Sequence, residues 1–244
     1  MAEKSLIEWT ESSWNPVTGC SKISDGCLNC YAERLALRLQ KMGLKKYRNG
    51  FKVTLHREAL KEPLRWKTPR MIFVCSMSDL FHEEVPDSFI REIFWVMNRA
   101  TQHIFQILTK RAERLAEFAD KVKWSKNIWA GVTVESAKYL YRIDYLKKVP
   151  AKVKFISMEP LLGPVPEIRE YLGEINWVIV GGESGPNARP MRPEWVRDIR
   201  DACLAKGIPF FFKQWGGINK KKTGRKLDGK EYNEMPLTEV GGKS

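Results

Sequence analysis

The sequence predicts an α/β protein, a partial (β/α)6-7 barrel of parallel strands. Short apolar runs rich in Val, Ile and Phe recur along the 244-residue chain, and each is followed by a polar loop and an amphipathic stretch. The runs lack strict alternation of apolar and polar residues, which is typical of strands that are covered on both faces. Strands that alternate with helices indicate parallel βα units joined by right-handed crossovers. Six or seven such units are consistent with an open or partial barrel.

Six apolar runs provide the predicted strands. A shorter apolar run at residues 14–17 precedes them and is a candidate for one more strand, which brings the count to six or seven. In chain order the six runs are residues 71–77, 103–109, 127–134, 152–158, 177–182 and 209–215.

Amphipathic stretches predict the helices that connect these strands. Residues 31–42 place two leucines and a methionine on one side of a helix, and residues 87–100 place four large apolar residues along one stripe. Residues 193–206 follow the same pattern. Asp87 and Ser88 are residue types that favour the N-cap, so we expect the second of these helices to begin there.

Two segments depart from this rhythm. Residues 43–70 interrupt the alternation, and we interpret them as a basic insertion after the first helix. Residues 218–244 are rich in Lys and Gly and contain few apolar residues, which predicts a loop or a partly disordered tail. The sequence therefore predicts a single domain over residues 1–217, followed by a tail over residues 218–244.

The charge of the chain is strongly positive and unevenly spread. There are 42 Lys and Arg against 29 Asp and Glu, which leaves a net charge of +13. From Arg38 to Arg70, eleven basic residues face only two acids, Glu58 and Glu62, so this stretch alone carries +9. Such a patch attracts polyanions, nucleic acid above all. The alternative interpretation is a solvated face on a basic protein.

Composition excludes several classes of protein. With 43% hydrophobic and 29% charged residues, the chain is globular rather than disordered. No apolar run approaches the roughly 20 residues that a membrane-spanning helix needs, and the polar start of the sequence lacks the apolar centre of a secretion signal. We therefore expect a soluble cytoplasmic protein without a membrane partner.

Three of the five cysteines crowd together in the run GCSKISDGCLNC, directly before a predicted helix. Thiolates of Cys20, Cys27 and Cys30 on such a loop can converge on one metal centre, helped by the positive helix terminus. Three ligands without a fourth nearby favour a [4Fe–4S] cluster with one open iron, while a zinc site or incidental cysteines remain alternatives. Cys75 and Cys203 stand alone in apolar stretches and are predicted to be buried.

Hydroxyl and charged residues end nearly every predicted strand. In parallel βα folds the functional groups gather at this carboxyl end, and capping of helices explains single residues more readily than a whole ring of them. The glycine pair at residues 181–182 would let backbone N–H groups approach a nucleoside or amino acid, or would form a tight turn without a ligand. The strand-end residues are Ser76, Ser78, Asp79, Thr109, Lys110, Glu135, Ser157, Glu159, Gly181, Gly182, Glu183, Lys213, Gln214 and Trp215.

With the cysteine loop placed after the first strand of a βα barrel, the chain resembles the radical S-adenosylmethionine (SAM) enzymes. More closely, it resembles the phage-associated three-cysteine-motif family, an uncharacterised branch near them. The spacing departs from the usual Cys-x3-Cys-x2-Cys, because the first gap here is six residues. The matching segments are WNPVTGCSKISDGCLNCYAERLA, FVCSMSDLFHEEVP, QILTKR, GVTVES, ISMEPLLGP, VIVGGESGPNARPM and FFKQWGG.

The resemblance implies a role for each group of residues. The three cysteines of the loop would ligate the cluster. Residues that would face or line SAM are Ser76, Ser78, Asp79, Thr109, Lys110, Glu135, Ser157, Glu159, Gly181, Gly182 and Glu183. Residues that would hold the substrate are Arg189, Lys213, Gln214 and Trp215, with the indole of Trp215 offering a stacking face for a base.

The resemblance also implies the reaction. An external one-electron reductant would charge the cluster, SAM would be cleaved to methionine and a 5′-deoxyadenosyl radical, and that radical would abstract hydrogen from a substrate. The basic patch suggests a base of DNA or RNA as the substrate, in modification or repair. Two alternatives stay open. One is a non-catalytic nucleic-acid-binding protein with a structural metal, and the other is a radical SAM enzyme that acts on a small molecule or peptide.

Overall fold

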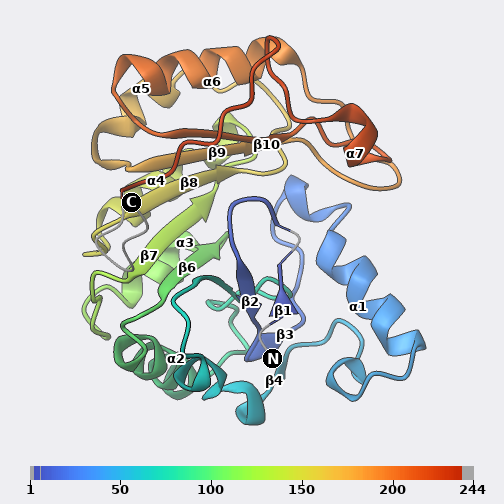
Figure 1. Cartoon of the computed structure of the whole chain (residues 1–244), viewed down its shortest axis with the longest axis vertical. Coiled ribbons are helices and arrows are strands. Elements are labelled where there is room, and N and C mark those ends of the chain that lie inside the picture. The colour runs from blue at the N-terminus through green and yellow to red at the C-terminus, as the bar shows by residue number, and fades with distance from the viewer. Residues whose placement is uncertain (1–2, 6, 238–244) are drawn as a thin grey trace.

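A computed structural model describes residues 3–5 and 7–237 of the chain (Figure 1). Seven parallel strands curl into a half-barrel, and the short strand β1 (Glu3–Lys4) pairs antiparallel at one edge. The order β1-β2-β5-β6-β7-β8-β9-β10 follows the chain, so each new strand lies beside the previous one. The parallel strands are β2 (Ser12–Trp14), β5 (Met71–Val74), β6 (Ile104–Thr109), β7 (Ile128–Thr133), β8 (Lys154–Met158), β9 (Trp177–Gly181) and β10 (Phe210–Gln214). The predicted partial barrel is therefore confirmed.

Helices connect the strands as the sequence predicts. Figure 1 shows α5 and α6 beside β9 and β10 at the top of the view, while α1 lies apart from them at the right. None of the helices among the described residues is long and apolar enough to cross a membrane. The helices are α1 (Tyr31–Lys41), α2 (Asp87–Arg99), α3 (Ala112–Glu117), α4 (Tyr141–Lys147), α5 (Ile168–Tyr171), α6 (Pro193–Ala205) and α7 (Lys220–Thr223).

The six predicted strands all form, but the first expected strand at residues 14–17 was wrong in its bounds. Two elements lie there, because Pro16 has no backbone N–H to donate to a ladder. The strand β2 ends at Trp14, and β3 (Val17–Thr18) instead pairs antiparallel with β4 (Thr54–Leu55) of the insertion. The strand β5 stops before Cys75, whose φ of 61° leaves the extended region.

The expected N-cap of α2 was also wrong by one residue. Pro86 occupies the N-cap position, with the extended φ of −61° and ψ of 142° that suit this position, and Asp87 is the first helical residue. The carboxylate of Asp87 accepts a hydrogen bond of 2.7 Å from Arg114 instead of capping the helix.

The insertion at residues 43–70 contains little regular structure besides β4. Three short 3-10 helices lie there, η2 (Lys45–Tyr47), η3 (Arg57–Ala59) and η4 (Glu62–Arg65). Tyr47 packs with Ala32 and Ala36 of α1 and with Met77, so the insertion is tied to the first helix.

The concave face of the half-barrel has an aromatic floor. The ring of Trp177 lies 5.7–6.2 Å, centroid to centroid, from four others, those of Trp9, Trp129, Phe155 and Phe211. Side chains two residues further along a strand point to the same face. Above this floor the concave face therefore turns small or polar, at Ser157, Gly181 and Lys213.

Gly131 is required by this floor. A Cβ placed on Gly131 would lie less than 3.0 Å from three ring carbons of Phe155. We expect Gly131→Ala to lower the free energy of unfolding in urea by about 1–3 kcal/mol, because the buried ring must shift. Gly173→Ala is the matched control, since a Cβ there meets nothing within 4 Å. Equal unfolding free energies for the two variants would contradict this packing.

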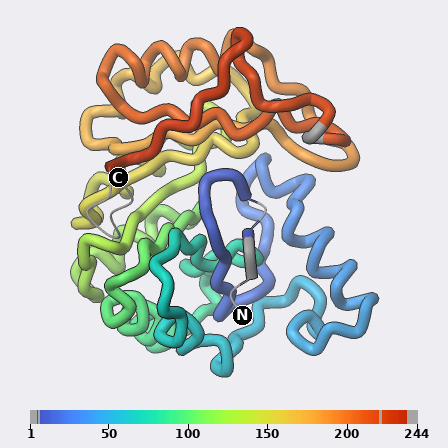
Figure 2. The backbone as a smooth tube through the Cα atoms, in the orientation of Figure 1, coloured from blue at the N-terminus to red at the C-terminus, as the bar shows by residue number. Residues whose placement is uncertain are grey.

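The tail packs against the last strand as far as the structure describes it. The backbone N–H of Phe212 donates to the carbonyl of Tyr232 at 2.9 Å, the indole of Trp177 donates to the carbonyl of Glu234 at 2.8 Å, and Leu227 is buried. Figure 2 shows this chain end running beside β10. Most of the segment is loop, as expected, and residues 238–244 lie outside the described part. A domain limit at residue 217 stays a prediction.

Candidate functional site

The three clustered cysteines lie on the loop between β3 and α1, at the carboxyl end of the half-barrel. Cys27 ends a short 3-10 helix, η1 (Asp25–Cys27), and Cys30 is the N-cap residue of α1. All three thiols are free and partly exposed, whereas Cys75 and Cys203 are free and buried, as predicted.

The thiol of Cys20 lies beside a cation. Nη1 of Arg111 lies 3.5 Å from its sulfur. The pKa of Cys20 is raised to about 12, chiefly by burial and in part by nearby Asp79, while Arg111 acts in the opposite direction. Ligation to iron requires the thiolate, and Arg111 is placed to stabilise that negative charge.

The donor set on this loop can be tested against the two kinds of metal centre. Within residues 3–5 and 7–237, no three His, Cys, Asp or Glu side chains are grouped so that they could hold a metal ion. A structural zinc ion needs four ligands around one point. Cysteines that hold an iron–sulfur cluster bind separate iron atoms, so their sulfurs need not meet at one point. Three thiols without a nearby fourth ligand fit a cluster better than a zinc ion.

A buried carboxylate fastens the middle of the cysteine loop. Glu135, directly after β7, is completely buried, and its side chain accepts hydrogen bonds from Ser24 and, at 2.8 Å, from Arg142. Nζ of Lys110 lies 3.4 Å from the same carboxylate. A Cβ on Gly26 would lie 2.6 Å from Cγ and Oε1 of Glu135, so only glycine lets the loop approach so closely.

Three further contacts hold the loop in place. The backbone N–H of Asp25 donates to the hydroxyl of Tyr139 at 3.0 Å, and Arg189 donates to the carbonyl of Asp25 at 2.9 Å. Asn29 donates to Glu183 at 3.0 Å. The extra residues between the first two cysteines are therefore used to dock the loop onto the ends of β7 and β9.

Glu183, which is buried at the end of β9, forms an ion pair with the partly exposed Arg189. Nε of Arg189 donates to Oε2 of Glu183 at 2.9 Å, and the backbone N–H of Arg189 donates to the same oxygen at 2.9 Å. Burial acts to raise the pKa of Glu183, but the hydrogen bonds from Arg189 and Asn29 outweigh it and lower that pKa to about 2.

Asp79 is the centre of a second network, at the ends of β5 and β6. It accepts hydrogen bonds from the hydroxyl of Thr109 at 2.6 Å and from the backbone N–H of Lys110 at 3.1 Å. Arg111 contacts Asp79 at 3.3 Å and donates to Glu83 at 2.9 Å. Partial burial acts to raise the pKa of Glu83, but hydrogen bonds from the backbone and Arg111 outweigh it and lower that pKa to about 2.

Glu159 and Lys213 face each other across the concave side of the sheet. Nζ of Lys213 lies 2.5 Å from Oε2 of Glu159, while Trp9 and Ser157 donate to Oε1 at 3.0 and 3.3 Å. Gly181 leaves room for this pair, since a Cβ on it would lie 3.3 Å from Cγ of Glu159. The pair therefore places one carboxylate and one ammonium group above the aromatic floor.

The remaining candidate residues are engaged elsewhere. Ser78 donates to the carbonyl of Val17 at 2.9 Å, and Ser76 donates to Asn15 at 3.2 Å. Gln214 donates to Ser184 at 2.7 Å. A Cβ on Gly182 would meet the backbone of residues 215 and 216, so this glycine serves the close approach of two chain segments.

Trp215 is partly buried and packs against the end of the barrel. Its ring lies 4.8 Å from that of Phe212, and its indole donates to the carbonyl of Lys226 at 2.8 Å. These contacts anchor the tail segment to the end of β10.

Sequence reasoning did not select several residues that hold the site together. Arg142 is buried in the first turn of α4 and carries no sequence signal, because an arginine on a helix is ordinarily exposed. Tyr139 and Asn29 are equally unmarked. Arg111 belongs to the predicted strand end that also holds Thr109 and Lys110, although no role was predicted for it, and Glu83 lies six residues after the predicted strand of residues 71–77.

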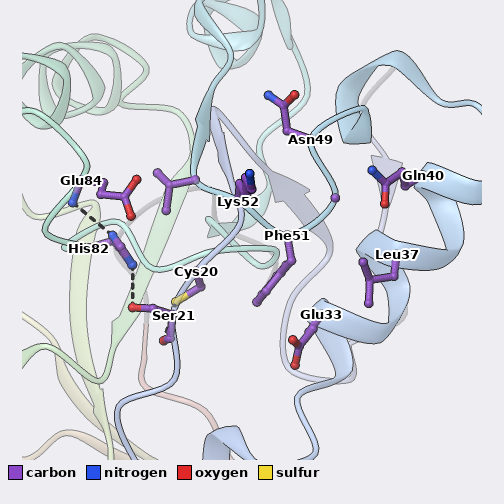
Figure 3. A pocket seen from close by; sticks show the side chains of 12 residues that line it. Cys20, Ser21, Glu33, Leu37, Gln40, Asn49, Phe51, Lys52, His82 and Glu84 are labelled. Atoms are coloured by element: carbon purple, nitrogen blue, oxygen red, sulfur yellow. Dashed lines mark hydrogen bonds between the residues drawn. The ribbon is translucent and has the colours of Figure 1, made fainter.

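A pocket at the site adjoins Cys20 on the side of α1. It has a volume of about 590 Å³ and lies between α1, residues 49–53 of the insertion, and the loop of residues 82–84 (Figure 3). His82 closes one end, with Nε2 lying 2.8 Å from the hydroxyl of Ser21. This space is in the size range of sites that bind small ligands.

Comparison with known families places the chain. The model of a family described as "Protein of unknown function (DUF5131)" matches residues 4–236. The chain belongs to this family. A comparison with curated proteins finds no match.

Among solved structures, spore photoproduct lyase is similar in fold. Its complex with dinucleoside spore photoproduct has a TM-score of 0.53 at 11% identity, covering 83% of this chain and 63% of that chain. A variant with bound AdoMet and dinucleoside spore photoproduct has a TM-score of 0.53 at 10% identity, covering the same shares. This chain thus spans less than two thirds of those proteins, and the likeness supports the radical-SAM-like half-barrel as a fold.

Proposed function

We propose that this member of the DUF5131 family is an iron–sulfur radical SAM enzyme that acts on a base in nucleic acid, in modification or repair. The observation that carries the proposal is the position of three free, partly exposed thiols on one loop at the carboxyl end of a seven-stranded parallel half-barrel. The similarity to a structure with bound AdoMet, which is SAM, supports it. An association with phages stays a prediction.

Cys20, Cys27 and Cys30 would hold the [4Fe–4S] cluster. When bound and reduced, the cluster would supply the one electron for reductive cleavage of a C–S bond of SAM, and so the chemistry that yields methionine and a hydrogen-abstracting 5′-deoxyadenosyl radical. An external one-electron donor would reduce the cluster.

The protein's own residues would bind and orient these groups. Arg111 would stabilise the thiolate of Cys20, and Glu135 would fix the loop that carries all three cysteines. Glu159 and Lys213, opposite charges above the aromatic floor, would pair with the amino and carboxylate groups of SAM by charge-assisted hydrogen bonds. The floor below them would exclude water from that side.

A nucleic-acid substrate is supported by charge. Within the described part of the chain, ten of the eleven basic side chains between Arg38 and Arg70 make no ion pair, and Arg57 pairs with Glu92. The solved neighbour with a dinucleoside ligand agrees with this assignment. A peptide or small molecule would leave these cations without a role.

The test is the iron and acid-labile sulfide content after anaerobic purification, with electron paramagnetic resonance of the reduced protein with and without SAM. We expect about four irons per chain and a spectrum that SAM perturbs. Cys27→Ala should lose the iron, whereas Cys203→Ala should keep it, because Cys203 is buried in α6. Zinc in the wild type, or iron unaffected by Cys27→Ala, would favour a nucleic-acid-binding protein with a structural metal.

A further inference from the structure

The pocket beside Cys20 has one wall in α1 and the other in the basic insertion. The first wall includes Leu37 and Gln40, and the second includes Asn49, Phe51 and Lys52. We call this space the insertion groove. Figure 3 shows Phe51 lying between α1 and Cys20, so an aromatic side chain stands inside the groove close to the candidate cluster ligand.

The positive charge around this groove is not neutralised. Lys52 lines the groove, and the other cations that we assign to its rim lie within four residues of the lining residues Gln40 and Asn49 in the sequence: Lys41, Lys45, Lys46 and Arg48. Lys41, Lys45, Arg48 and Lys52 are exposed and make no ion pair with any described residue. The pKa of the buried His56 is lowered, first by burial and next by the positive charge of Lys46. Arg48 acts in the same direction.

Acidic groups oppose this charge at only two places on the groove lining. Glu33 of α1 is already paired with Lys22 at 3.1 Å, which leaves Glu84 at the far end. The rim of the groove is therefore cationic, and its interior offers an aromatic ring and amide groups. Proteins that bind single-stranded nucleic acid combine a positively charged groove with aromatic side chains on which bases stack.

We propose that the insertion groove binds a single strand of nucleic acid. Phosphates contact Lys45, Lys46 and Lys52 on the rim, and a base stacks on Phe51. A duplex is too wide for a space of about 590 Å³, which is the size of a site for a few small groups. The proposal rests on the proposed function for its catalytic meaning, since the groove leads the strand to Cys20.

The binding test uses fluorescence anisotropy with a fluorescein-labelled 12-nucleotide single strand, as DNA and as RNA, and a labelled DNA hairpin with the same number of phosphates. Each is titrated between 50 and 200 mM salt. For single strands, the slope of log K against log salt changes by about 0.7 for each phosphate contact. We expect the triple variant Lys45→Gln, Lys46→Gln, Lys52→Gln to bind more weakly, with a slope that is smaller by about 2.

Two further variants make the test specific. Phe51→Leu should weaken binding by about tenfold with an unchanged salt slope, because it removes stacking rather than charge. The control is Lys148→Gln, Arg169→Gln, Lys206→Gln, three exposed cations at α4, α5 and α6. It has the same net charge as the rim variant and should bind like the wild type. Melting temperature and iron content verify that every variant is folded.

The outcomes separate this proposal from the proposed function. Equal affinities and slopes for the rim and control variants, or tighter binding of the hairpin than of the single strands, would overturn the groove proposal. The groove proposal would also be overturned if the wild type bound none of the oligonucleotides and a protein electron donor reduced the rim variant more slowly than the wild type. The groove would then bind that donor. A wild type without iron that still binds through these residues would overturn the proposed function alone.

Discussion

Gly26→Ala is expected to reduce the iron content from about four atoms per chain to less than one, with the fold retained. The added Cβ would lie 2.6 Å from Cγ and Oε1 of Glu135. Glu135 cannot yield easily, because it is completely buried and held by Arg142 at 2.8 Å and by Lys110 at 3.4 Å. Moving that carboxylate away from its cations would leave buried charge uncompensated. The cysteine loop must move instead, and its sulfurs with it.

The measurement is iron per chain after anaerobic reconstitution, together with the melting temperature of the cluster-free protein. Gly163→Ala is the matched control, since a Cβ there would come no closer than 3.8 Å to another side chain, that of Ser136. We expect it to bind iron like the wild type. If Gly26→Ala keeps four irons and an unperturbed spectrum, the docking of the loop on Glu135 does not position the cysteines.

The sequence predicted the fold more completely than the site, because contacts such as that of the cysteine loop with Glu135 are not visible in the sequence. Each apolar run indicates a strand that is buried on both faces, and this pattern can be recognised from the residues of that segment alone. All six predicted strands therefore form. The two-residue strands β1, β3 and β4 carry no such signal, because a strand that short has no period to detect. Pro16, visible in the sequence, marks the point where the first expected strand divides.

The site depends instead on pairs that are remote in sequence. Asp79 with Thr109 and Lys110 joins the ends of the neighbouring strands β5 and β6, which the barrel topology already predicted to be adjacent. Glu159 after β8 and Lys213 of β10 instead meet across β9, which lies between their strands. Arg142 inside a helix gave no hint that it would meet Glu135.

The cysteine spacing shows the same limit. A six-residue gap between the first two cysteines is visible in the sequence as a departure from the usual motif. The residues in this gap dock the loop, because Ser24 and Gly26 contact Glu135 and Asp25 contacts Tyr139. These contacts depend on which groups the half-barrel places opposite the loop. The residue types were identifiable from sequence, whereas their partners required the fold.

Arg189→Gln is expected to lower the free energy of unfolding by about 2 kcal/mol at pH 7, and this loss should disappear in acid. Glu183 is buried with its pKa lowered to about 2 from 4.5, mainly because the hydrogen bonds from Arg189 outweigh the effect of burial. A carboxyl group with a depressed pKa in the folded state adds stability above its unfolded pKa, and loses that contribution as the pH falls through the folded pKa. The difference between wild type and variant should therefore be full above about pH 4.5 and vanish near pH 2.

Urea unfolding between pH 7 and pH 2.5 measures this difference, in a Cys27→Ala background so that acid release of iron does not interfere. Arg169→Gln removes an exposed arginine without an ion pair among the described residues, and its difference from the same background should stay near zero at every pH. A constant loss for Arg189→Gln across the whole range would mean that this arginine acts through packing and its bond to the carbonyl of Asp25. A loss confined to neutral pH would show that the charge of Glu183 holds the β9 loop, and through Asn29 and Arg189 the cysteine loop, in place.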